Sequence, residues 1–156
     1  MKGDPRILDV LNDVLTAELT TINQYFLAAR MMRQWGFDRL GVYYRKESIE
    51  EMKHAETLMD RILFLEGVPN VQKLNKVAIG ENVEEQLKLD LAEEERAVKR
   101  LNDGIKLCRE ASDNGTEDLL TKILVSEEEH VDWIETQLGL ITTLGATAYL
   151  AEQLKE

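Results

Sequence analysis

The fold is decided by two copies of the spacing Glu-x-x-His, Glu51-Met52-Lys53-His54 and Glu127-Glu128-Glu129-His130, which contain both histidines of the chain. Residues i and i+3 of an α-helix share one face, so each copy places a carboxylate beside an imidazole. Such a pair can hold a metal ion, and two pairs that face each other can hold two. We therefore expect both copies to lie on helices whose polar faces meet inside the molecule.

The two copies belong to a longer internal repeat, in which equivalent residues are 76 positions apart (51 and 127, 54 and 130). The same offset relates Glu18 to Glu94, and each lies on an otherwise apolar stripe with the 4-3-4-3 spacing typical of a helix. The stripes are Leu11, Leu15, Glu18, Ile22, Tyr25 and Leu87, Leu91, Glu94, Val98, Leu101. The chain is therefore interpreted as two similar helical hairpins, each bringing one lone Glu and one Glu-x-x-His to a shared interior.

Each part of this pattern has an ordinary explanation when it is taken alone. A helical Glu is usually solvated, and a single Glu-x-x-His is weak support for a site in a chain with 30 Asp and Glu residues. The whole pattern, however, buries four carboxylates and two imidazoles, and each unpaired buried charge costs several kcal/mol. Two cations remove that cost, so the pattern favours a dimetal site. Its expected members are Glu18, Glu51, His54, Glu94, Glu127 and His130.

Composition indicates a single domain over residues 1–156, with enough apolar residues, 44%, for a substantial core. No strand-like alternation, membrane-length apolar run or signal peptide is found, so a cytoplasmic protein is expected. The single cysteine, Cys108, excludes an internal disulfide and falls on an apolar stripe, which predicts a buried thiol. The net charge of −11 argues against nucleic acid as a partner. It suits the handling of cations, although solubility alone also accounts for it.

Helix breakers divide the chain into four long helices and a short one, expected at residues 5–35, 38–66, 82–112, 116–143 and 146–154, with a tight turn at Asn114-Gly115. The short links make the first pair and the second pair antiparallel. The link at residues 67–81 spans at most about 50 Å when extended. The second helix is about 42 Å long, so this link can just return along it. The prediction is an all-α, ferritin-like four-helix bundle with one long crossover and a short C-terminal fifth helix.

Seven segments carry a resemblance to a known family: residues 1–4, 23–26, 47–55, 61–67, 79–81, 127–133 and 135–138. Through them the whole chain resembles the bacterioferritins, the haem-containing bacterial ferritins, and the complete second Glu-x-x-His separates it from ordinary ferritins. The resemblance implies iron storage and detoxification in a homo-oligomeric cage of 24 subunits. It also implies a ferroxidase that oxidises Fe(II) with dioxygen or peroxide at an intra-subunit di-iron site and stores ferric mineral.

The resemblance assigns roles to the expected ligands. Glu51 and Glu127 would bridge the two irons, while Glu18 with His54, and Glu94 with His130, would complete the two ends. Mixed carboxylate and imidazole ligation suits iron, although zinc or manganese also fits such a set. For Tyr25, two roles remain open: the electron donor that the family suggests, or a core aromatic residue with a bonded hydroxyl group.

Met52 lies one helical step from Glu51, so it points out of the bundle when Glu51 and His54 point inward. Apolar residues expected on the same outer side are Leu19, Phe26, Ile49 and Met59. An exposed apolar strip of this kind predicts a subunit interface. The resemblance implies that Met52 binds the iron of haem b at a two-fold interface, and the alternative is a plain dimer contact.

Other features bear on partners and on competing functions. Lys46 stands where many relatives have His, and its protonated amine disfavours an iron site on the inner cage surface, although Glu50 remains. The family suggests a ferredoxin-type reductant for iron release; neither nucleic acid nor membrane is expected as a partner. The alternative function is a non-storage di-iron peroxidase or oxygenase on the same bundle. A small DNA-protecting ferritin-like protein is a third hypothesis, against which the acidic charge argues.

Overall fold

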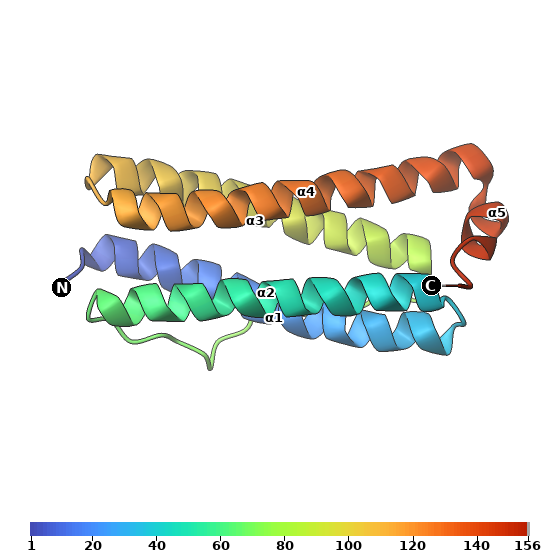
Figure 1. Ribbon diagram of the computed structural model, residues 1–156, viewed down its shortest axis with the longest axis horizontal. Helices are drawn as coiled ribbons and strands as arrows, with labels where there is room; N and C mark the ends of the chain where they lie inside the picture. The colour runs from blue at the N-terminus through green and yellow to red at the C-terminus, as the bar shows by residue number, and fades with distance from the viewer. Residues whose placement is uncertain (156) are drawn as a thin grey trace.

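The computed structural model describes residues 1–155 and is all-helical over that range, as predicted (Figure 1). The helices are α1 (Pro5–Gln34), α2 (Asp38–Phe64), α3 (Val83–Glu110), α4 (Asn114–Leu144) and α5 (Ala146–Ala151). In Figure 1, α1 and α2 form one antiparallel pair, α3 and α4 form the other, and α5 lies across one end. The long crossover makes α2 and α3 parallel, which confirms the predicted four-helix bundle with a short fifth helix.

Side-chain caps explain where the helices begin. The carboxylate of Asp4 accepts a hydrogen bond from the backbone N–H of Arg6 at 2.8 Å, and Pro5 occupies the first helical position. Asn82 caps α3 in the same way, at 2.9 Å from the N–H of Glu85. Each cap satisfies a backbone donor that the first helical turn leaves free, so the predicted starts of α1 and α3 are correct to within one residue.

The predicted turn at Asn114-Gly115 is wrong, because these residues form the first turn of α4. Asp113 is the N-cap of that helix, and its carboxylate accepts from the N–H of Thr116 at 3.0 Å. The chain reverses just before, at Ser112, whose φ of 57° is left-handed. Helix α5 ends at Ala151, three residues before its predicted end, and α2 ends two residues early, at Phe64.

Polar side chains of α1 hold the crossover in place. Asn12, Thr20 and Gln24 each accept a hydrogen bond from a backbone N–H of the crossover, at 2.8 to 2.9 Å. Their donors belong to Asn70, Asn75 and Ala78. Because these residues have no helical partners, their N–H groups depend on side chains for hydrogen bonds. These three hydrogen bonds hold the crossover, which joins the two helical hairpins, against α1.

The apolar core has two parts. Of the residues of α1, Leu11 and Leu15 belong to one apolar cluster, and Tyr25 belongs to the other. Helix α4 likewise contributes Ile123 to the first cluster and Ile134 to the second. Each helix therefore leaves the apolar core near its middle, and the buried carboxylates and histidines lie in that layer. Cys108 is buried in the first cluster, as expected.

Candidate metal centre

Two overlapping groups of carboxylates and histidines occupy the polar layer. One consists of Glu18, Glu51, His54 and Glu127, and the other of Glu51, Glu94, Glu127 and His130. In each group, one candidate ligand atom per residue lies within 4.8 Å of all the others. The structure therefore brings together all six residues that the sequence predicted. Glu51 and Glu127 are the two that belong to both groups.

All four long helices contribute to this centre. Glu18 comes from α1 and Glu94 from α3, while α2 and α4 each supply both residues of one Glu-x-x-His. The spacing of three residues places the carboxylate and the imidazole of each copy on the same inward face. The internal repeat thus becomes two similar halves of a single centre.

Several contacts cross from one helix to another. Nδ1 of His54 lies 3.2 Å from Oε1 of Glu127 and 3.5 Å from Oε2 of Glu18. In the other half, Nδ1 of His130 lies 3.1 Å from Oε1 of Glu94. The hydroxyl of Thr21 donates to Oε2 of Glu51 at 3.3 Å and holds that carboxylate toward the centre.

Candidate ligand atoms in the centre remain without hydrogen-bond partners. Over residues 1–155, six buried side-chain nitrogen and oxygen atoms have none, and five of them belong to this centre. They are Glu18 Oε2, His54 Nδ1, Glu94 Oε2, Glu127 Oε1 and His130 Nε2. Buried polar atoms are normally paired, so these five fit a site in which cations supply the missing partners.

The acid–base properties of the centre point the same way. Burial, together with the charge of Glu127, raises the pKa of Glu94 to about 8. Burial and the charge of Glu51 raise the pKa of Glu127 to about 7. Burial alone would lower the pKa of His54, but the nearby carboxylates of Glu127 and Glu51 outweigh burial and raise the pKa to about 10. The metal-free centre therefore holds protons at neutral pH, where bound cations would otherwise balance the carboxylates.

Tyr25 is buried beside the centre. Its hydroxyl donates to Oε1 of Glu94, and its ring centroid lies 5.2 Å from that of His130. Burial and the charge of Glu94 raise its pKa well above the ordinary value, so the phenol is neutral. These contacts are those of a core aromatic residue with a bonded hydroxyl group, and they also place the ring within reach of the candidate ligands.

Three neighbours of His130 were not predicted from the sequence. Oε2 of Glu47 lies 4.0 Å from Nδ1 of His130, and burial raises the pKa of this half-buried carboxyl. The ring of Tyr43 stacks on Trp133 at 3.5 Å, and both rings lie near the imidazole. Glu47 precedes Glu51 by one helical turn, which is a signal that could have found it; no comparable signal marks the pairing of Tyr43 with Trp133.

Met52 points out of the bundle, as expected, and its side chain is 49% exposed. Phe26 of α1 is 54% exposed, and Leu19, Ile49 and Met59 are partly buried. The strip thus presents an accessible thioether among apolar side chains, and Met52 would be the residue that holds a haem there. Lys46 is exposed on α2 and lines a shallow hollow together with Ile49 and Lys53.

Comparisons with known proteins agree with this geometry. A model of the ferritin-like domain matches residues 8–144. The bacterioferritin of Mycobacterium bovis is 49% identical over 152 residues, covering 97% of this chain and 96% of that protein. The bacterioferritin of Streptomyces coelicolor is 45% identical, and the match covers 100% of this chain and 93% of that protein. The bacterioferritin of Brucella melitensis is 42% identical, and the match covers 96% of this chain and 92% of that protein. No helix within residues 1–155 is both long and apolar enough to cross a membrane.

Proposed function

The chain belongs to the bacterioferritin family, and from that premise we propose that it stores and detoxifies iron as a ferroxidase. One observation carries the proposal: both candidate metal groups include Glu51 and Glu127. A carboxylate shared by two positions can contact two cations at once through its two oxygens. In this proposal the substrate is a pair of Fe(II) ions, which Glu18 and His54 would hold at one end and Glu94 and His130 at the other.

The chemistry is an electron transfer that needs two iron ions. Each Fe(II) gives one electron, and two electrons with two protons convert hydrogen peroxide into two molecules of water, or dioxygen into peroxide. The chain's part is to hold both ions close together in a buried layer. Carboxylates and imidazole are ligands that both iron oxidation states accept. Without metal, burial raises the pKa of Glu94 to about 8 and that of Glu127 to about 7, so these carboxyl groups give up protons when cations bind.

We extend the proposal to the assembly and its cofactor. The ferric product is stored as mineral in a cage of 24 copies, in the cytoplasm, and a ferredoxin-type reductant releases it. Met52 and its symmetry mate would hold haem b at a two-fold interface, and the outward, half-exposed thioether supports this proposal. When bound, haem supplies a one-electron carrier in the wall of the cage.

Native mass and iron loading of one preparation test the proposal. A cage of 24 copies that takes up far more iron than its binding sites account for, with rapid Fe(II) oxidation, is the expected result. A dimer that oxidises Fe(II) without retaining mineral would overturn storage and favour the non-storage di-iron enzyme.

A further inference from the structure

A hollow lies at the end of the bundle where α5 crosses from α4 toward α2 (Figure 1). Its lining comes from α2, α4 and residues 149–153, and its volume of about 510 Å³ suits a small molecule. The segment after α5 is tied to α2, because the backbone N–H of Arg39 donates to the carbonyl oxygen of Gln153 at 3.1 Å. None of the six candidate metal ligands lines this cavity, which we call the end hollow. It is therefore separate from the metal centre.

One wall of the end hollow is aromatic. The rings of Tyr43 and Trp133 stack with 3.5 Å between their centroids and 11° between their planes, and both side chains line the cavity. The buried side chain of Leu40 and the exposed side chain of Leu140 extend this apolar surface. Aromatic rings favour stacked arrangements with one another, so this wall suits a ligand with a flat ring system.

The lining of the end hollow carries more positive than negative charge. Arg39 and Lys46 contribute cations, and among the described lining residues Glu152 contributes the one carboxylate. Neither cation forms an ion pair with a carboxylate of residues 1–155. The charge of Lys46 acts partly on its neighbour Glu47, so Arg39 is the stronger candidate for contact with an anion. In a chain of net charge −11, this local reversal of charge favours an anion here.

Neutral polar groups lie beside Arg39. The buried hydroxyl of Tyr149 donates to Oε1 of Gln137 at 2.8 Å. Burial raises the pKa of Tyr149 to about 12, and the charge of Arg39 opposes that rise, so the guanidinium lies near this hydroxyl. The Nε2 amide of Gln137 donates to no acceptor within residues 1–155. Arg39 and Gln137, both next to Tyr149, therefore offer N–H donors to an oxyanion.

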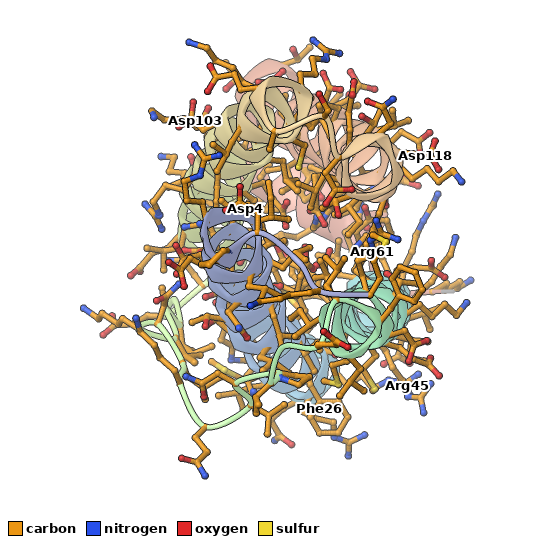
Figure 2. The ribbon with its side chains drawn as sticks, turned by 90° about the vertical axis from the view of Figure 1, so that its left-hand side faces the viewer. Asp4, Phe26, Arg45, Arg61, Asp103 and Asp118 are labelled. Atoms are coloured by element: carbon orange, nitrogen blue, oxygen red, sulfur yellow. The ribbon has the colours of Figure 1, made fainter. Side chains whose placement is uncertain are left out.

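The aromatic wall separates the end hollow from the metal centre. Figure 2 shows α2 and α4 on one side of the bundle, where Arg61 and Asp118 are labelled, and α1 and α3 on the other. On the α2–α4 side, the ring centroids of Tyr43 and Trp133 lie 5.9 and 6.3 Å from that of His130. A ligand stacked on this wall would thus lie one aromatic layer away from the candidate metal ligands.

We propose that the end hollow binds a planar aromatic anion, a flat ring system that carries a phosphate or carboxylate group. The ring lies against the wall formed by Tyr43 and Trp133, and the acidic group accepts hydrogen bonds from Arg39 and Gln137. The guanidinium offers a planar fork of donors that matches either oxyanion. The negative charge of the whole chain disfavours anions elsewhere on its surface, so the cations of the end hollow provide selectivity.

The test compares flavin mononucleotide with riboflavin, which have the same flat ring system and differ by one phosphate group. Each is titrated with the whole chain, purified without metal or haem, and flavin fluorescence is followed, because stacking on aromatic side chains quenches it. The parent should bind flavin mononucleotide at least about tenfold more tightly than riboflavin, as expected for charge-assisted contacts. Adenosine monophosphate, used as a competitor, tests a second source of the same chemistry: the tighter ligand identifies the preferred ring, and failure of both would overturn the proposal.

Two variants at exposed positions test the two halves of the site. Arg39→Gln should remove most of the preference for the phosphate, whereas the matched control Arg109→Gln should keep it, because Arg109 pairs with Glu117 at the other end of the bundle. Leu140→Trp should weaken binding of both flavins about tenfold or more, since the larger side chain fills the cavity without touching the buried core.

Three results would overturn the proposal. They are an equal affinity of the parent for both flavins, an unchanged preference in Arg39→Gln, and unchanged binding in Leu140→Trp. Displacement of flavin mononucleotide by an equal concentration of inorganic phosphate would also overturn it, because the site would then recognise the anion without the ring.

Discussion

Nδ1 of His54 lies 3.2 Å from Oε1 of Glu127, although the two residues belong to different hairpins. The first candidate metal position therefore takes residues from both halves of the chain. The second does the same, since Glu51 of α2 joins Glu94 and His130 there. Neither hairpin can build a complete position alone, and the pair of shared carboxylates couples the two positions.

The first prediction concerns those shared carboxylates. Glu51→Ala and Glu127→Ala should each slow Fe(II) oxidation by about 100-fold or more, because both metal positions lose a ligand. The assembly should survive, since removal of a buried carboxylate also removes its desolvation cost. Stopped-flow absorbance is the measurement. Glu129→Ala is the matched control, because Glu129 is an exposed neighbour in the same run of glutamates. Fast oxidation in both bridging variants would refute their role.

The second prediction is that metal binding releases protons. At pH 7 the metal-free centre holds protons on Glu94, with a pKa of about 8, on His54, with a pKa of about 10, and partly on Glu127, with a pKa of about 7. Metal ions bind the deprotonated forms, so affinity should rise as the pH rises from 6 to 8. Anaerobic calorimetric titration with Co(II), in two buffers of different ionisation enthalpy, should show the release as a heat that depends on the buffer. An identical heat in both buffers would contradict this account of the metal-free centre.

The third prediction concerns Asp90, a fully buried carboxyl that accepts hydrogen bonds from Gln24, Tyr44 and Gln86. Burial raises its pKa to about 6, although these bonds oppose the shift. The folded form then binds the proton more tightly than the unfolded form, so stability from this group is lost as the pH rises from about 4 to 6. When the pH is lowered from 7 to 5, the free energy of unfolding of the metal-free parent should rise by about 1 kcal/mol relative to that of Asp90→Asn.

Denaturant unfolding of both proteins at the two pH values measures this difference. Asp90→Ala serves as the second variant, because it leaves three buried donors without an acceptor. The free energy of unfolding of this variant should be about 2 to 4 kcal/mol lower than that of the parent at either pH. A constant difference between the parent and Asp90→Asn at the two pH values would show that Asp90 does not titrate in this window.

The fourth prediction separates haem binding from packing at Met52. Met52→Leu keeps a similar apolar volume but removes the thioether. The variant should form the same assembly as the parent and lose the spectrum of bound haem. Visible spectra and native mass should be measured on one sample. A bound-haem spectrum identical to the parent's would mean that Met52 is not the axial ligand and is only a contact between copies.

The sequence was most informative where local chemistry and the repeat agreed. Pro5, Asn82 and the Glu-x-x-His spacing each act within one or two helical turns, so helix starts and the candidate ligands could be predicted. The turn at Asn114-Gly115 was mispredicted because the capping carboxylate of Asp113 begins the helix earlier than the glycine suggests. Asp113 is typical of a helix start and Asn114-Gly115 is typical of a turn, so the sequence alone supports two different positions for the start of α4.

Features that depend on tertiary contacts were not accessible from the sequence. Asp90 lies on a helix rich in acids and looks like a solvated residue, yet its partners Gln24 and Tyr44 come from α1 and α2. The stacking of Tyr43 on Trp133 likewise joins α2 to α4. The offset of 76 residues reveals equivalent positions but not which side chains face each other across the bundle.

We propose that two metal ions lie between Glu51 and Glu127. Crystals loaded with iron, measured at the iron absorption edge, test it most directly by anomalous scattering. We predict two peaks per chain, about 3.5 to 4 Å apart, with one beside His54 and the other beside His130. A single peak per chain, or peaks away from these six residues, would show that the centre does not hold two metal ions.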